Sequence, residues 1–160
     1  YDQKETEAVN NQKTTLWSAA LDNTKVKKYP DRELNHYIEF NSDQLDQTAK
    51  QYGVSREDML KQYDLDDEDE FNAVNEDSSK LRVKQEMLIQ YIADKENLSY
   101  TDKEKEALIK SFEAQGYDAD AIEQQTGRTL EDYVHIELLY EKVLDFLLDN
   151  ANITGTPTTE

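Results

Sequence analysis

The placement of proline and glycine restricts the fold of this chain more than any other feature. Proline breaks helices, and the sequence contains only Pro30 and Pro157, so the long stretch between them can form uninterrupted helices. Gly53, Gly116 and Gly127 each follow a helix-like run and precede a new start signal. This is typical of glycine in the left-handed position after a helix end. The pattern predicts an all-α chain.

Helix start signals stand just after these breaks. Ser55, Thr101 and Thr129 each place a hydroxyl where it can accept a hydrogen bond from an orphan backbone N–H, with acids in the following turn. Thr101 and Glu104 have the spacing of a full capping box, and Asp118 can cap a short helix after Gly116. These signals predict seven helices, at about 4–22, 31–51, 56–63, 67–97, 102–115, 119–126 and 130–150.

Apolar residues recur at helical spacing in two of these helices. In the helix expected at 67–97 the stripe consists of Phe71, Val74, Ser78, Leu81, Leu88, Tyr91 and Ile92. In the last helix it consists of Ile136, Leu139, Tyr140, Val143, Leu144 and Leu147, broadened by Phe146 and Leu148, so this helix should be deeply packed. The order of helix, short helix and long helix occurs twice, from Pro30 and from Thr101. It predicts two related helical units, or arms, of similar build.

The composition favours an elongated body over a large spherical core. Residues of the set AVILMFWYC make up 36% of the chain, and charged residues make up 34%. That is enough apolar material for stripes on helices. The expected domain covers residues 1–153, and residues 154–160 are expected to be a flexible C-terminal tail because they lack an apolar anchor.

The net charge of −18 argues against nucleic acid as a partner, because binding to phosphates depends on Lys and Arg. No apolar run approaches the length that spans a bilayer, so this segment is not expected to insert into a membrane. Cysteine is absent, which excludes disulfides and thiol chemistry. No signal peptide is visible and the chain opens at Tyr1, as a processed or excised piece would, so cytoplasmic and exported locations both stay open.

No pattern in the sequence predicts a catalytic centre, a cofactor or a metal. The two histidines, His36 and His135, have no second metal ligand at helical spacing and are read as ordinary helix residues. The acidic run from Asp64 to Glu70 resembles a calcium loop only superficially, because Asp69 and Asn75 stand where glycine and glutamate are required. We therefore interpret the run as the acid-rich start of a helix.

Aromatic side chains are the remaining functional lead. The chain has ten tyrosines, four phenylalanines and one tryptophan. Tyrosine tolerates partial exposure, because its ring can be buried while its hydroxyl stays solvated, which suits varied contact surfaces. Nine side chains could line a shared concavity that binds other polypeptides, although helix packing alone could also explain each of them: Tyr37, Phe40, Tyr52, Met59, Tyr63, Phe71, Met87, Phe112 and Tyr117.

Several segments, taken in order, resemble the C-terminal domain of the trigger factor chaperones. Ile92-Ala93, Glu96 and Thr101-Asp102 reproduce the end of a long helix, a short extended connection and the capped start of the next helix. The segment from Leu139 to Ile153 resembles the final helix of that family. Val26 to Pro30 resembles its extended segment before an arm helix, and Tyr52 to Ser55 resembles one of its turns. The resemblance is stronger over 81–153 than over 20–80.

The resemblance implies a helical body with two arms that form a cradle for unfolded or nascent polypeptides. Complete members of the family also carry a ribosome-docking domain and a prolyl isomerase domain, neither of which lies in these 160 residues. The polar stretch from Asn72 to Lys80 departs from the expected pattern and indicates an altered first arm. The alternative is a dimerisation or fixed-partner module of an exported or lipoprotein isomerase, so a homodimer stays open.

Overall fold

A computed structural model describes residues 2–151 of the chain, and the C-terminal tail expected at 154–160 lies outside this range. The described residues form helices and no strand, as predicted. The helices are α1 (Asp2–Asp22), α2 (Asp31–Tyr52), α3 (Arg56–Gln62), α4 (Glu68–Glu96), α5 (Asp102–Ala114), α6 (Ala119–Thr126) and α7 (Leu130–Asn150). All seven coincide with the helices expected from the sequence to within two residues.

The predicted helix ends are confirmed in detail. Ser55, Asp118 and Thr129 each accept a hydrogen bond from a backbone N–H in the first turn of their helix. Thr101 and Glu104 form the complete capping box. The α4 helix ends at Asn97, which takes the left-handed conformation that glycine takes elsewhere in the chain, with φ at 55°.

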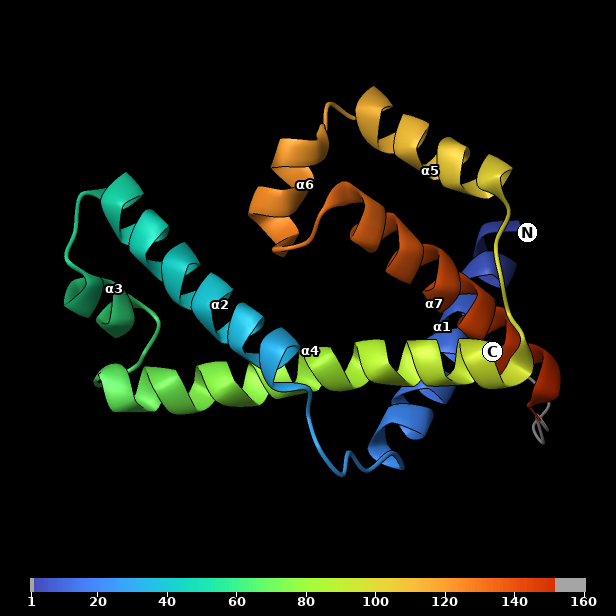
Figure 1. Cartoon of the computed structure of the whole chain (residues 1–160), viewed down its shortest axis with the longest axis horizontal. Helices are drawn as coiled ribbons and strands as arrows, with labels where there is room; N and C mark the ends of the chain where they lie inside the picture. Colours follow the sequence, from blue (N-terminus) through green and yellow to red (C-terminus); the bar gives the residue numbers. More distant parts are fainter. Residues whose placement is uncertain (1, 152–160) are drawn as a thin grey trace.

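The helices form a body and two arms (Figure 1). The body consists of α1, α7 and the C-terminal half of α4. The first arm consists of α2, α3 and the N-terminal half of α4, and it extends away from the body at the left of Figure 1. The second arm consists of α5 and α6, which fold back over α7. The helix order of the two units is therefore the same, but their packing differs.

Each end of α4 belongs to a separate apolar core. The body core contains Trp17 and Leu21 of α1, together with residues of α4 and α7 such as Ile89 and Val143. The first-arm core contains Leu45 and Ala49 of α2 and Met59 and Leu60 of α3, with Val54, Leu65 and Phe71 packed against them. The low apolar content of the chain is thus divided between two small cores.

The stripe predicted on α7 is confirmed, whereas the one predicted on α4 is confirmed only in part, at Phe71, Leu88 and Ile92. Leu139 and Val143 are buried in the body core, with Tyr140 and Leu147 packed beside them. On α4, however, Val74, Leu81 and Tyr91 of the predicted stripe are exposed. The buried face of this helix is instead formed by Asn75, Ser79, Val83, Leu88, Ile89 and Ala93, of which the first two are polar.

A polar seam joins α2 to α4 between the two cores. Asn41 Nδ2 lies 2.8 Å from Asn75 Oδ1 and 3.2 Å from Ser79 Oγ, and it donates to both. Asn75 Nδ2 in turn donates to the Ile38 carbonyl at 2.9 Å. Buried polar groups are tolerated when they are fully hydrogen-bonded, and this seam explains why the stretch from Asn72 to Lys80 is polar.

Polar contacts, with little apolar burial, attach α5 to α7. The helix has no buried residue. Glu104 pairs with Lys142 of α7 at 2.5 Å, Lys105 pairs with Glu131 at 2.7 Å, and the Phe112 ring lies 5.6 Å from that of Tyr133. Among the described helices none is long and apolar enough to cross a membrane.

Replacement of Asn75 should destabilise the fold. Asn75→Ala removes one of the two acceptors of the Asn41 amide and the side-chain donor to the Ile38 carbonyl, which should lower the free energy of unfolding by about 1–3 kcal/mol in urea denaturation. Asn72→Ala, at an exposed position of the same helix, is the control and should change it by less than about 0.5 kcal/mol. Equal effects of the two substitutions would contradict a structural role for the seam.

Acid should detach α5 from α7. The hydrogen bonds from Lys142 and Thr101 lower the pKa of Glu104 to about 2. Because this pKa is lowered in the folded chain, the contribution to stability is complete above the ordinary range of Glu and disappears as pH falls toward 2. We expect the nuclear magnetic resonance signals of α5 to lose their folded shifts over this pH range. In Glu104→Gln they should change already at neutral pH, whereas the exposed Glu106→Gln should behave like the parent chain.

Candidate functional site

The two arms meet where α2 faces the turn between α6 and α7. Carbonyl groups at the end of α6 accept hydrogen bonds from side chains of the first arm: Gln44 Nε2 donates to the Gln124 carbonyl at 2.9 Å, and the guanidinium of Arg82 donates to the Thr126 carbonyl. His36 Nε2 donates to the Gly127 carbonyl, which fixes the proton on that nitrogen. The C-terminal end of a helix carries partial negative charge, so a cationic donor such as Arg82 is favourable there.

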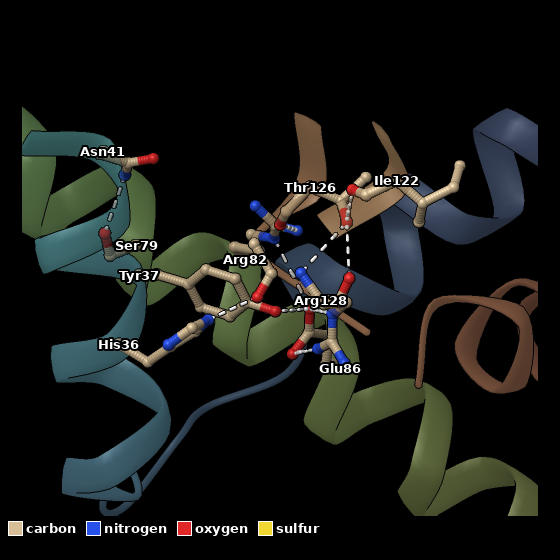
Figure 2. A network of polar contacts seen from close by, with 10 residues as sticks. His36, Tyr37, Asn41, Ser79, Arg82, Glu86, Ile122, Thr126 and Arg128 are labelled. Carbon is tan, nitrogen blue, oxygen red and sulfur yellow. Dashed lines mark hydrogen bonds and ion pairs between the residues drawn. The ribbon is translucent and has the colours of Figure 1, made fainter. Parts of the chain in front are cut away.

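Glu86 is the centre of a network at this meeting point, which Figure 2 shows. Its carboxylate accepts a hydrogen bond from the Tyr37 hydroxyl at 2.8 Å and one from Arg128 Nε at 3.0 Å. Arg128 adds a second contact through its other nitrogen, and Arg82 Nε lies 3.6 Å away. We call Glu86, Tyr37, Arg82, Arg128 and His36 the inter-arm junction.

Tyr37 is the buried member of the inter-arm junction. Only 2% of its surface is exposed, and its ring lies beneath the guanidinium groups of Arg82 and Arg128, at 4.0 and 5.6 Å from the ring centre. Burial, followed by the charge of Glu86, raises the pKa of its hydroxyl, so Tyr37 stays protonated and donates. This side chain therefore fixes the position of Glu86 between the two arms.

Gly127 allows the second arm to approach α2 closely. Its φ of 69° is left-handed, and a Cβ at this position would lie 2.9 Å from the ring of Phe40. Such a contact is shorter than packed carbon atoms allow. Phe40 therefore packs against the backbone of the turn.

The structure does not bring the nine predicted contact residues into one concavity. Tyr37 is buried in the inter-arm junction and Met59 in the first-arm core, so in this structure neither is accessible to a partner. Phe40 packs on Gly127, and Phe112 packs on Tyr133. The remaining five are at least partly accessible: Tyr52, Tyr63 and Phe71 on the first arm, Met87 on α4 and Tyr117 after α5.

An open groove on the first arm gathers part of this set. It has a volume of about 430 Å³ and runs between α2 and α4. Tyr63 and Phe71 line it, together with three apolar residues that sequence reasoning did not select: Leu45, Leu65 and Val74. Asn41, Gln44, Thr48, Asn75 and Ser78 supply polar groups. We call this the first-arm groove. Alternating apolar and amide groups of this kind suit contact with an extended polypeptide.

A second and more polar cavity lies at the inter-arm junction. Its volume is about 660 Å³, and its walls include His36 and Arg128 together with the acids Glu33, Glu39 and Asp132. Within the described part of the chain, no group of three His, Cys, Asp or Glu side chains is arranged to hold a metal ion. Arg82 and Glu86 have the local i,i+4 spacing of an ion pair, but the partners that join them to the arms lie more than 40 residues away, so the sequence does not reveal the junction.

The profile described as the C-terminus of the bacterial trigger factor protein matches residues 2–149. The chain belongs to the trigger factor C-terminal family. It is 30% identical to the trigger factor of Staphylococcus saprophyticus over 156 residues, which is 95% of this chain and 34% of that protein. It is 28% identical to that of Staphylococcus epidermidis over 94% of the chain and 34% of that protein. The trigger factor of Bacillus pumilus is likewise 28% identical, over 92% of this chain and 34% of that protein.

The chain thus spans about a third of the length of these trigger factors. No solved structure gives a significant match. The family assignment confirms the resemblance drawn from the sequence, including its less similar N-terminal part, because the match begins at residue 2.

Substitution of Gly127 should test how closely the arms of this trigger factor domain approach. Gly127→Ala introduces both a left-handed alanine and a contact with Phe40. Gly53→Ala is the control, because its φ of 66° is similar but nothing lies within 4 Å of its Cβ. We expect urea denaturation to show a loss of about 1 kcal/mol for Gly53→Ala and a clearly larger loss for Gly127→Ala. Equal losses would contradict the packing of Phe40 on this turn.

Proposed function

We propose that this chain binds unfolded or partly folded polypeptides, as the client-binding module of a larger trigger factor-like protein. The observation that carries the proposal is the first-arm groove. It places apolar and aromatic side chains beside amide and hydroxyl groups, on an arm that has its own core and projects from the body.

The geometry of the first-arm groove favours contact with many polypeptide sequences rather than with a single fixed ligand. Tyr63 is 57% exposed and Val74 is 52% exposed, and both side chains line the same groove. The groove is open along its length and has no charged residue in its lining. Dispersed contacts of this type should give micromolar affinity, which corresponds to about −8 kcal/mol.

The family membership supports the same function but does not extend to the whole trigger factor. Activities that belong to the remaining two thirds of the related proteins are not assigned to this chain. A catalytic role is not part of the proposal.

The proposal predicts suppression of aggregation through the first-arm groove. In an assay with a chemically unfolded client, Tyr63→Ser combined with Val74→Ser should weaken suppression several-fold, because both substitutions remove apolar contact from the groove. Tyr91→Ser is the control: Tyr91 is 61% exposed, similar to Tyr63, but lies outside the groove. Suppression should change little with salt, since apolar contact dominates.

Three other results would contradict client binding by apolar contact in the first-arm groove. A strong decrease in suppression on adding salt would indicate attraction of basic clients by the net charge of −18. Equal losses in the groove variant and in Tyr91→Ser would indicate a diffuse surface instead of the groove. If the chain at several-fold excess left aggregation unchanged and bound no unfolded polypeptide, the fixed-partner or dimerisation function would take the place of client binding.

A further inference from the structure

A small cavity in the body lies beside the inter-arm junction and shares Arg82, Glu86 and Arg128 with it. It has a volume of about 220 Å³ and opens between α4 and α7, with Trp17 of α1 at one side. Trp17, Tyr133 and Tyr140 contribute aromatic rings to its lining, Ile89 and Ile136 contribute aliphatic groups, and Glu137 contributes a carboxylate. Its volume lies below the roughly 300 Å³ at which pockets for drug-sized ligands begin, so it suits a small group.

Three aromatic side chains line this cavity, together with the ionised groups of Arg82, Arg128, Glu86 and Glu137. The rings of Trp17 and Tyr140 have their centres 5.0 Å apart and meet edge to face at 70°, and both line the cavity. Tyr133 lies one helical turn before Glu137 on α7 and lines the same space. Aromatic faces attract cations, and tryptophan does so most strongly.

Glu137 adds a formal negative charge that has no partner. Its side chain is half-buried, and in the described part of the chain it makes no hydrogen bond or ion pair. Burial, followed by the nearby Glu141, raises the pKa of its carboxyl group. An unpartnered carboxylate in such a place destabilises the folded chain, and a cation in the cavity would relieve this cost.

The other ionised groups that line the cavity are already paired. Arg128 contacts Glu86 through two nitrogens, and Arg82 is engaged by the Thr126 carbonyl and by Glu86. Both guanidinium groups also lie over the Tyr37 ring. An anion entering the cavity would therefore have to compete with Glu86, whereas a cation would meet a free carboxylate.

We infer that the cavity formed by Trp17, Tyr133, Tyr140 and Glu137 binds an alkylammonium group. Aromatic rings would surround the carbon substituents of the cation, and the carboxylate would offset its charge. The group could belong to a lysine side chain of a polypeptide or to a free organic ammonium ion, since both present the same chemistry. This binding goes beyond the proposed client binding, because no residue of the first-arm groove lines this cavity.

The fluorescence of Trp17 can be used to measure ligand binding in this cavity. It is the only tryptophan of the chain, so its fluorescence reports occupancy of this cavity directly. Choline is the probe, and 3,3-dimethylbutan-1-ol is its uncharged carbon analogue of nearly equal shape. We expect choline to change the fluorescence in a saturable way and the alcohol to bind at least about tenfold more weakly, because it lacks the charge.

Two glutamine substitutions then test whether the carboxylate of Glu137 is the charge that attracts choline. Glu137→Gln should weaken choline binding by about tenfold and leave binding of the alcohol unchanged. Glu141→Gln removes the same charge from an exposed position of the same helix and should have little effect. The Glu137→Gln chain should also be at least as stable as the parent chain in urea, because it no longer buries an unpartnered charge. A loss of binding with unchanged or increased stability separates a binding role from a structural one.

The source of the ammonium group is decided by a second pair of ligands. Nα-acetyl-lysine amide and Nα-acetyl-norleucine amide differ in the charged end of the side chain. Preference for the lysine derivative over choline would assign the cavity to a polypeptide side chain, and the reverse would assign it to a free ammonium ion. The inference is overturned if neither cation binds better than its neutral analogue, if acetate binds in place of choline, or if Glu141→Gln acts as strongly as Glu137→Gln. These outcomes leave the aggregation assay, and hence client binding, unaffected.

Discussion

The carboxylate of Glu86 is the contact on which the arrangement of this domain depends. It lies on α4, which runs from the first arm into the body, and it receives the Tyr37 hydroxyl from α2 and the Arg128 guanidinium from the turn before α7. Three segments distant in sequence are therefore fixed to one another by a single side chain. A half-buried carboxylate with several charge-assisted hydrogen bonds is strongly destabilised when any partner is removed. The geometry of the space between the arms thus depends on electrostatics at one point.

This dependence follows from the composition of the chain. The two apolar cores lie toward opposite ends of α4, and the region between them is occupied by Asn41, Asn75 and Ser79 and then by the inter-arm junction. A chain with so few apolar residues cannot fill a continuous core of this length. Hydrogen bonds and ion pairs replace apolar packing in the middle. They are directional, so they define the relative orientation of the arms more narrowly than apolar contact would.

Local features of this fold were predictable from the sequence, whereas its long-range contacts were not. Caps such as Thr101–Glu104 depend only on neighbouring residues, so the helix ends could be located closely. The face of α4 that is buried could not, because Asn75 and Ser79 are buried through partners on α2, which a search for apolar spacing does not detect. For the same reason, Tyr37 and Met59 resembled contact residues although they are buried. Glu137 is indistinguishable in sequence from the other acids of α7, and only the cavity beside Trp17 sets it apart.

The continuity of α4 has a mechanical consequence. Its 29 residues span about 44 Å without proline or glycine, so it connects the body to the far end of the first arm as a single rod. The part of α2 beyond the polar seam, from Asn41 to Tyr52, extends about 17 Å, so a rotation of about 5° at the seam would displace the end of that helix by about 1.5 Å. A small change in hydrogen-bond geometry near Asn75 is thus amplified at the far end. The amides of Asn41 and Asn75 and the hydroxyl of Ser79 therefore form the point about which the first arm would rotate relative to the body.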